Sequence, residues 1–168
     1  SKLKQETEDV LDFRLKSYEA FKNMTLPSFG PSLDIDFDKI IYYASNDNKI
    51  NSSWESIDKN ITNEFDTLGV IESEKNLDGM GVQYESEVIY HNMIKELEEK
   101  KVIFTSIEDA FKKYPELVKK YFSKIVKPDE NKFTALNCSC FSGGSFIYIP
   151  KNTTEKLPAI AISGPFGA

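Results

Sequence analysis

The first helix is predicted by hydrophobic residues that recur at helical spacing near the start of the chain. Leu11, Leu15 and Tyr18 fall on one face, four and then three residues apart, with Val10 and Phe21 beside that face. Acidic residues gather where the N-terminal end of this helix would lie, which suits the helix dipole. Prolines and a glycine follow from residue 27 onward, so we expect the helix to end near residue 25.

A second helix is predicted over residues 54–68. It follows a stretch that we expect to be extended or irregular (33–45) and a polar loop (45–53). Its apolar stripe has the spacing of one buried helix face and consists of Ile57, Ile61, Phe65 and Leu68. Gly69 then provides a C-terminal stop, because glycine readily adopts the left-handed conformation that ends many helices.

The middle of the chain alternates turns, helices and one strand. In chain order we expect a turn at residues 78–81, a helix over 85–101, a buried strand at 102–104, a helix over 106–113 and a helix over 115–125. Ser106 and Asp109 have the spacing of a capping box, which favours a helix start at that point. Pro115 suits the first turn of the next helix, where its missing N–H costs nothing.

The C-terminal part changes character. A strand is expected at residues 133–140, a turn at 142–144 and a second strand at 146–149. Helices therefore come first and strands last, which predicts an α+β fold. No apolar run has the length of a transmembrane helix.

The charge balance limits the classes of partner. The chain carries 21 basic and 27 acidic residues, a net charge of −6, which disfavours binding to nucleic acid or to an anionic membrane. The lysine-rich run from Lys112 to Lys132 is interpreted as a solvated helix face. Arg14 is the single arginine, and arginine differs from lysine wherever bidentate pairing matters. The abundance of Lys, Asn, Ile, Tyr and Phe is typical of an AT-rich gene.

The sequence assembles no catalytic motif that we recognise. His91 is interpreted as a surface or packing residue, and the carboxylate pairs Glu85 with Glu87 and Asp34 with Asp36 as ordinary acidic surface. A phosphate-binding loop and a dinucleotide fingerprint are both missing, so we expect no ATP binding of the P-loop type. We assign no catalytic, cofactor-binding or metal-ligating residue.

The two cysteines leave alternatives open. Cys138 and Cys140 would share one face of a strand, too far apart to bond to each other, and could bind a metal or cluster if other ligands joined them. The simpler interpretation is two small buried apolar residues. The run Gly164–Gly167 (Gly-Pro-Phe-Gly) resembles a loop of flavin-dependent reductases, which makes a flavin-linked reductase fragment a second hypothesis.

Three longer segments resemble SufB proteins. The first is SKLKQETEDVLDFRLKSY at residues 1–18, and the second is FDTLGV at residues 65–70. The third runs from Val102 to Lys151 and includes YPELV, NKFTALN and GGSFIYIPK in the family's order. Together with Ile35–Phe37 and Ile41–Ala44, the resemblance covers residues 1–152.

The resemblance implies a scaffold for iron–sulfur cluster assembly rather than an enzyme. Members of this family pair with a SufD-type paralogue and a SufC-type ABC ATPase, and the ATPase would supply ATP hydrolysis. We expect residues 1–130 to form the N-terminal helical domain and residues 131–152 the first strands of a right-handed parallel β-helix. The family's cluster-handling residues lie mainly beyond this stretch, so we expect no cofactor here, although the full-length family implies an iron–sulfur cluster. A SufD-like paralogue is the alternative.

Several features depart from the family pattern. The loop at residues 45–53 lacks the cysteine cluster of many bacterial members, and Cys138 and Cys140 stand where small residues are usual, so no ligand role transfers to them. Residues 153–168 do not match. We expect a truncated β-helix to self-associate or to be covered by residues 157–162. The composition resembles that of a plastid-encoded, apicoplast-like protein; bacterial cytoplasm is the alternative location.

Overall fold

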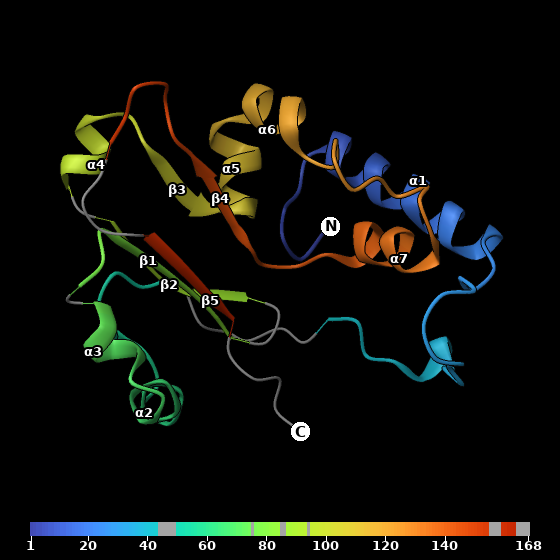
Figure 1. Cartoon of the computed structure of the whole chain (residues 1–168), viewed down its shortest axis with the longest axis horizontal. Coiled ribbons are helices and arrows are strands. Elements are labelled where there is room, and N and C mark those ends of the chain that lie inside the picture. The colour runs from blue at the N-terminus through green and yellow to red at the C-terminus, as the bar shows by residue number, and fades with distance from the viewer. Residues whose placement is uncertain (44–49, 75, 85–86, 94, 155–158, 164–168) are drawn as a thin grey trace. The chain divides into compact units, whose positions relative to one another are not determined.

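The computed structural model describes residues 1–43, 50–74, 76–84, 87–93, 95–154 and 159–163. The chain divides into two compact units (Figure 1). Unit 1 comprises Ser1–Tyr43 and Glu108–Ser142, and unit 2 comprises Ala44–Ile107 and Gly143–Ala168. Each unit is therefore built from two separate stretches of sequence. In the described part of the chain, no helix combines the length and apolar character that crossing a bilayer requires.

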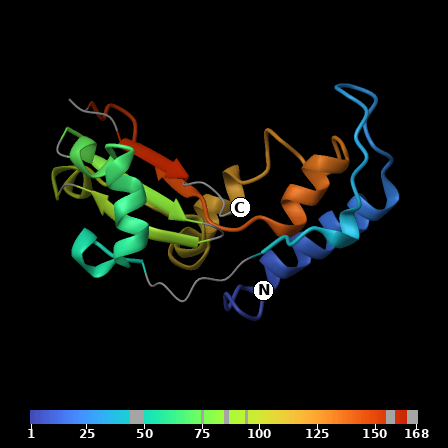
Figure 2. The ribbon, with the colours of Figure 1, turned by 90° about the horizontal axis from the view of Figure 1, so that it is seen from below.

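Unit 1 is built from helices. In chain order they are α1 (Glu8–Asn23), the 3-10 turn η1 (Phe37–Lys39), α5 (Ile107–Lys113), α6 (Pro115–Tyr121) and α7 (Lys132–Cys140). Helices α1 and α7 lie side by side in both ribbon views (Figures 1 and 2). Lys132 of α7 connects the two helices, because its ammonium donates to the carbonyl oxygens of Phe21 (2.9 Å) and Met24 (2.8 Å) at the end of α1.

Unit 2 contains two small sheets and short helices. Its helical elements are η2 (Trp54–Ser56), α2 (Lys59–Thr67), α3 (Val70–Glu74) and α4 (Lys95–Glu99). Its strands are β1 (Gly79–Tyr84), β2 (Glu87–Met93), β3 (Ile103–Ser106), β4 (Ser145–Tyr148) and β5 (Ala159–Ser163). One sheet has the order β2-β1-β5, antiparallel between β1 and β2 and parallel between β1 and β5. The other pairs β3 with β4 antiparallel.

The core of unit 2 lies between α2 and the larger sheet. Ile61 and Phe65 of α2 pack with Met80 and Val82 of β1 and with Ile89 of β2. Phe65, Met80, Val82 and Ile89 are almost completely inaccessible to solvent. The predicted stripe of the second helix is thus confirmed for Ile57, Ile61 and Phe65, whereas Leu68 is exposed. The segment is a 3-10 turn followed by a helix from Lys59 rather than one helix from Trp54, and Gly69 ends it at φ +72°.

The first helix is confirmed, but the predicted apolar row is not its buried face. Leu11, Leu15 and Tyr18 are 41%, 53% and 47% exposed, whereas Val10 and Ser17 are buried. Ser17 is tolerated inside because its hydroxyl donates to the carbonyl oxygen of Phe13, 2.8 Å away. The inward face is therefore one-third of a turn from the row that hydrophobicity alone selects.

The expected turn at residues 78–81 is wrong, because residues 79–81 lie in β1. The helix expected over 85–101 is confirmed only for α4, whereas residues 87–93 form β2 and residues 85–86 and 94 lie outside the described part of the chain. Gly79 and Gly81 are strand residues because the ring of Phe104 lies against them; a Cβ on Gly79 would come within 2.9 Å of that ring. Their role is close packing between strands rather than chain reversal.

The expected strand at residues 133–140 is also wrong, since this segment is helix α7. Asn131 caps it by accepting hydrogen bonds from the N–H groups of Phe133 (2.9 Å) and Thr134 (3.1 Å). The Thr134 hydroxyl accepts from the Asn131 N–H and completes a capping box. The buried residues Ala135 and Cys138 are three apart, which is helical spacing.

Four other expected elements are confirmed in type and approximate position. The buried strand at 102–104 corresponds to β3, the helices over 106–113 and 115–125 to α5 and α6, and the strand at 146–149 to β4. Mixed helices and small sheets agree with the α+β class. Residues 159–163 form β5, whereas residues 155–158 and 164–168 lie outside the described part of the chain.

Candidate functional site

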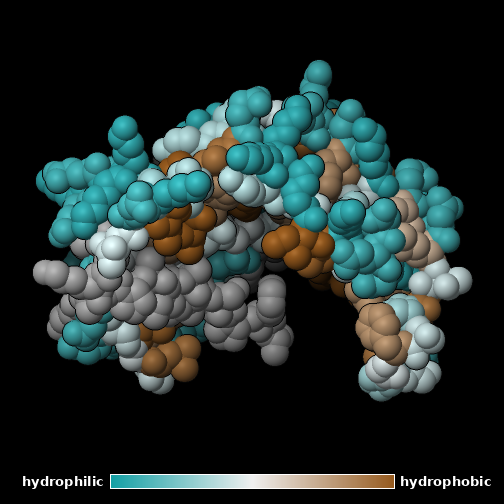
Figure 3. Space-filling view, turned by 45° about the horizontal axis from the view of Figure 1, so that its top comes forward, coloured by the Kyte–Doolittle hydropathy of each residue, from teal (hydrophilic) through white to brown (hydrophobic). Residues whose placement is uncertain are grey.

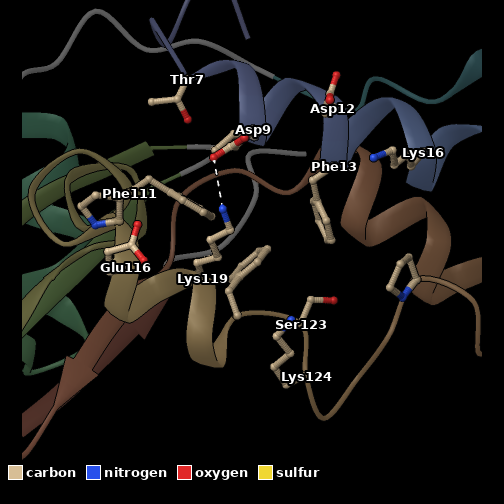
Figure 4. A pocket seen from close by; sticks show the side chains of 14 residues that line it. Thr7, Asp9, Asp12, Phe13, Lys16, Phe111, Glu116, Lys119, Ser123 and Lys124 are labelled. Carbon is tan, nitrogen blue, oxygen red and sulfur yellow. Dashed lines mark ion pairs between the residues drawn. The ribbon is translucent and has the colours of Figure 1, made fainter.

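A groove in unit 1 is the best candidate for a binding site. It has a volume of about 350 Å³ and lies between α1 and the segment that runs through α6 to Pro128. Figure 4 shows Phe13 extending from α1 into this space, opposite Lys119 and Ser123. Residues more than 100 positions apart in the sequence therefore line one surface groove.

Phenylalanine rings form an apolar cluster beneath the groove. The ring of Phe122 packs edge-on against Phe13 (centroids 5.3 Å apart) and Phe111 (5.1 Å), and lies 5.2 Å from Phe141. Phe13, Phe111 and Phe122 all line the groove and remain partly accessible. Edge-to-face rings hold one another in place, so the groove offers a fixed apolar surface to a ligand group.

The rim of the groove carries charges of both signs. Asp9 and Asp12 come from α1, and Glu116 and Lys119 come from α6. The Lys119 ammonium lies 3.8 Å from a carboxylate oxygen of Asp9, the contact drawn as a dashed line in Figure 4. Both side chains are highly exposed, so this pair contributes little stability and can open for a ligand.

Arg14 joins three parts of unit 1 through contacts with Glu6, Ser139 and Phe141. Its guanidinium donates two hydrogen bonds to the Glu6 carboxylate, from Nε at 2.9 Å and from Nη2 at 2.5 Å, and a third to the carbonyl oxygen of Ser139. The same group lies over the ring of Phe141, with Cζ 3.9 Å from the centroid. The single arginine of the chain thus occupies a place that requires a planar, forked donor.

The charge state of Glu6 follows from these contacts. Burial favours the protonated form of the Glu6 carboxyl, but hydrogen bonds from Arg14 and Ser1 and the charge of Arg14 outweigh burial. The pKa of Glu6 is therefore lowered from its ordinary value of 4.5. The pair is ionised at neutral pH and joins the segment before α1 to α1 itself.

The two cysteines lie on α7 rather than on a strand. Cys138 is buried with its sulfur 3.9 Å from the Ser123 hydroxyl, and the Cys140 thiol donates to the carbonyl oxygen of Leu136 at 3.0 Å. Burial raises the pKa of both thiols, which keeps them protonated and weakly nucleophilic. Within the described ranges, no three His, Cys, Asp or Glu side chains are grouped to hold a metal ion.

The remaining sequence candidates are dispersed. His91 lies on β2 rather than on a helix, and its ring packs edge-on against Phe104 at 4.8 Å, which supports the packing interpretation. Asp36 caps η1 by accepting from the N–H of Asp38 and pairs with Lys39. Glu85 and the run Gly164–Gly167 lie outside the described residues.

Sequence reasoning did not find the groove. Its floor combines Phe13 of α1 with Phe111 of α5 and Phe122, which follows α6, and no local pattern joins these residues. The sequence feature that could have indicated an apolar site is the presence of phenylalanines within the predicted helices, in particular Phe111 and Phe122.

The chain matches known proteins along most of its length. Residues 2–159 match the family model described as SufBD protein N-terminal region. An iron–sulfur cluster assembly SufBD family protein of Staphylococcus aureus (strain USA300) is 49% identical over 160 residues, which is 94% of this chain and 34% of that protein. One of Staphylococcus haemolyticus, described in the same words, is 47% identical over the same shares. The chain spans about a third of the length of these curated relatives.

Proposed function

The chain belongs to the SufBD family, and from this premise we propose that it is the N-terminal region of a SufB-type scaffold for iron–sulfur cluster assembly. The observation that carries the proposal is the match over residues 2–159 to the N-terminal region of that family. The two staphylococcal relatives carry iron–sulfur cluster assembly in their names. The cluster is the cargo of such a scaffold.

This region acts through protein contacts and is not itself an enzyme. Its partners are a SufC-type ABC ATPase, which hydrolyses ATP, and a SufD-type paralogue. The groove supports a contact role, since an apolar floor of fixed rings with charged residues at its rim is typical of surfaces that receive a partner's side chain. The proposal of SufB rather than SufD rests on the block from YPELV to IPK at residues 114–151.

Fold and location complete the proposal. The proposal includes a right-handed parallel β-helix in the whole protein. Of residues 131–152, where its first strands were expected, 132–140 are helical and β4 is the strand, paired antiparallel with β3. The domain boundaries at residues 130 and 152 stay a prediction. The abundance of Lys, Asn, Ile, Tyr and Phe, which is typical of an AT-rich gene, favours a plastid-encoded protein of the apicoplast type, with bacterial cytoplasm as the alternative location.

A chimera tests the assembly role. In the S. aureus relative, the matching N-terminal region is replaced by residues 2–159 of this chain, in cells that lack the native protein. We expect growth and the activity of a cytosolic iron–sulfur enzyme to be restored, because nearly half of the aligned positions are identical.

A groove variant sharpens this experiment. Phe122→Asp in the chimera should abolish restoration, because a carboxylate would lie on the apolar floor, whereas Glu64→Lys on the exposed side of α2 should not. The level of chimera protein is measured by immunoblot. A chimera that accumulates to the normal level yet restores no enzyme activity would contradict the proposed role.

A further inference from the structure

The exposed face of α1 is an apolar row with an acidic border. Leu11, Leu15 and Tyr18 stand in line along the helix and are about half exposed. Asp12 and Glu19 are two turns apart on one side of that row, and both are exposed. Glu19 accepts from the Lys22 ammonium at 2.7 Å, and that ammonium lies over the Tyr18 ring; because this pair is exposed, it contributes little stability and a partner's lysine can replace Lys22. We call Leu11, Asp12, Leu15, Tyr18 and Glu19 the α1 face. Anchors at this spacing are those with which a helix binds a partner surface.

A second apolar surface in unit 1 carries the opposite charge. After α6 the chain turns outward, and Ile125 and Val126 are 91% and 54% exposed at its tip. Residues 119–127 contain four lysines and no acidic residue. We call residues 121–127 the basic tip. It is the local exception to an acidic chain.

The basic tip is held in its outward shape. The Ser123 hydroxyl donates to the carbonyl oxygen of Val126 at 3.0 Å, and a Glu130 carboxylate oxygen accepts from the Lys127 N–H at 3.0 Å. Ser123 itself has a φ of +54°. The loop therefore presents Ile125 without further ordering, which lowers the entropic cost of burying it against another surface.

We propose that two copies of this chain associate by seating the basic tip of one copy on the α1 face of the other. The aliphatic side chains of the tip cover Leu11, Leu15 and Tyr18, and Lys124 and Lys127 approach the carboxylates of Asp12 and Glu19. The contact joins different surfaces, so it closes a two-fold pair where the reciprocal contact also forms and otherwise continues from copy to copy. Charge complementarity selects this occupant, because the tip is a cationic apolar surface on the same molecule. The proposal is independent of the role in iron–sulfur assembly.

Two charge-reversed variants of the 168-residue chain, measured alone and mixed with each other, test the proposal. One variant carries Asp12→Lys with Glu19→Lys, and the other carries Lys124→Glu with Lys127→Glu. Each alone sets like charges together and should raise the dissociation constant at least about tenfold in sedimentation velocity. Mixing the two variants should restore association, since both contacts of the mixed pair are then complementary.

Apolar and control variants complete the test. Leu15→Ser and Ile125→Ser should each weaken association, and because both side chains are exposed, circular dichroism should show an unchanged fold. Glu64→Lys with Asp66→Lys, and Lys59→Glu with Lys95→Glu, lie at exposed positions of unit 2, change the net charge by the same amounts as the two test variants and should have no effect.

Three results would overturn the proposal. The first is a chain that stays monomeric up to near-millimolar concentration. The second is association that survives both charge-reversed variants, which would place the contact elsewhere, as on β4. The third is a monomer that sediments with phosphatidylserine vesicles through Ile125, which would assign the tip to a membrane.

Discussion

Arg14 shows how one side chain can connect three parts of unit 1. Its guanidinium pairs with Glu6 before α1, donates to the last turn of α7 at Ser139, and covers the ring of Phe141. Both members of the ion pair are mostly buried, with 12% and 7% of their side chains exposed. A lysine could supply the charge but neither the fork nor the planar face.

We therefore predict that Arg14→Lys destabilises the protein by about 1–2 kcal/mol, part of what a hydrogen-bonded charged group contributes. Urea unfolding followed by circular dichroism measures the change in the free energy of unfolding. The matched control is Lys16→Arg, two residues away on the exposed side of α1, which should shift it by less than about 0.5 kcal/mol. Equal effects of the two substitutions would mean that the fork contributes nothing.

The same pair makes stability depend on pH. The pKa of Glu6 is lowered by folding, so the folded state binds this proton less readily than the unfolded chain does. The stabilisation from Glu6 is complete above its ordinary pKa of 4.5 and is lost as the pH falls through the lower folded value. We expect the wild type to lose more unfolding free energy than Glu6→Gln between pH values of about 5 and 3. Parallel curves for the two proteins would contradict this.

At the scale of elements, α7 depends on a cap formed by its own sequence. The Asn131 side chain accepts hydrogen bonds from two N–H groups at the start of the helix, and the Thr134 hydroxyl accepts one from the Asn131 N–H. Asn131→Ala should cost about 1 kcal/mol of unfolding free energy, whereas Asn131→Asp should keep most of it. Asn63→Ala, on the exposed side of α2, removes no cap and serves as the control in the same thermal or urea unfolding experiment. A neutral Asn131→Ala would show that packing against α1 alone holds α7.

Helices with local start and stop signals could be predicted from the sequence. Pro115 and Gly69 mark true boundaries because their effect is on the backbone itself. Strands β1 and β2 could not be predicted, since Gly79 and Gly81 read as turn residues until Phe104 is known to lie against them. The strand expected at residues 133–140 was wrong for a related reason. A short apolar pattern fits both the two-residue period of a strand and the 3.6-residue period of a helix, and the capping box at Asn131 favours the helix.

The inward face of α1 and the groove are properties of packing between distant segments. Hydrophobicity selects Leu11 and Leu15, but in a helix that packs against α7 the buried residues are Val10 and Ser17, on the neighbouring face. Hydrophobic side chains also form separate brown patches on the mostly hydrophilic face of the molecule in Figure 3. Single exposed apolar side chains are normal on protein surfaces, whereas contiguous ones mark interaction sites. The exposed apolar residues of the α1 face and the basic tip are grouped in this way, at Leu11, Leu15 and Tyr18 and at Ile125 and Val126.

At the scale of the whole chain, the open question is whether this region can hold the cluster by itself. The chain has two cysteines, whereas cysteine-ligated clusters usually use four. Both thiols have a raised pKa, and both are engaged within unit 1, Cys138 beside Ser123 and Cys140 with the Leu136 carbonyl. Deprotonating and withdrawing them would disturb the packing of α7.

We predict that anaerobic reconstitution with iron and sulfide leaves the chain without a stable cluster. Iron and sulfide should stay far below stoichiometric amounts after desalting, and the visible absorbance should match that of Cys138→Ser/Cys140→Ser. A ferredoxin whose cluster is held by four cysteines, reconstituted in parallel, controls for the procedure. Stoichiometric iron and sulfide that disappear in the double variant would show that α7 opens to ligate a cluster.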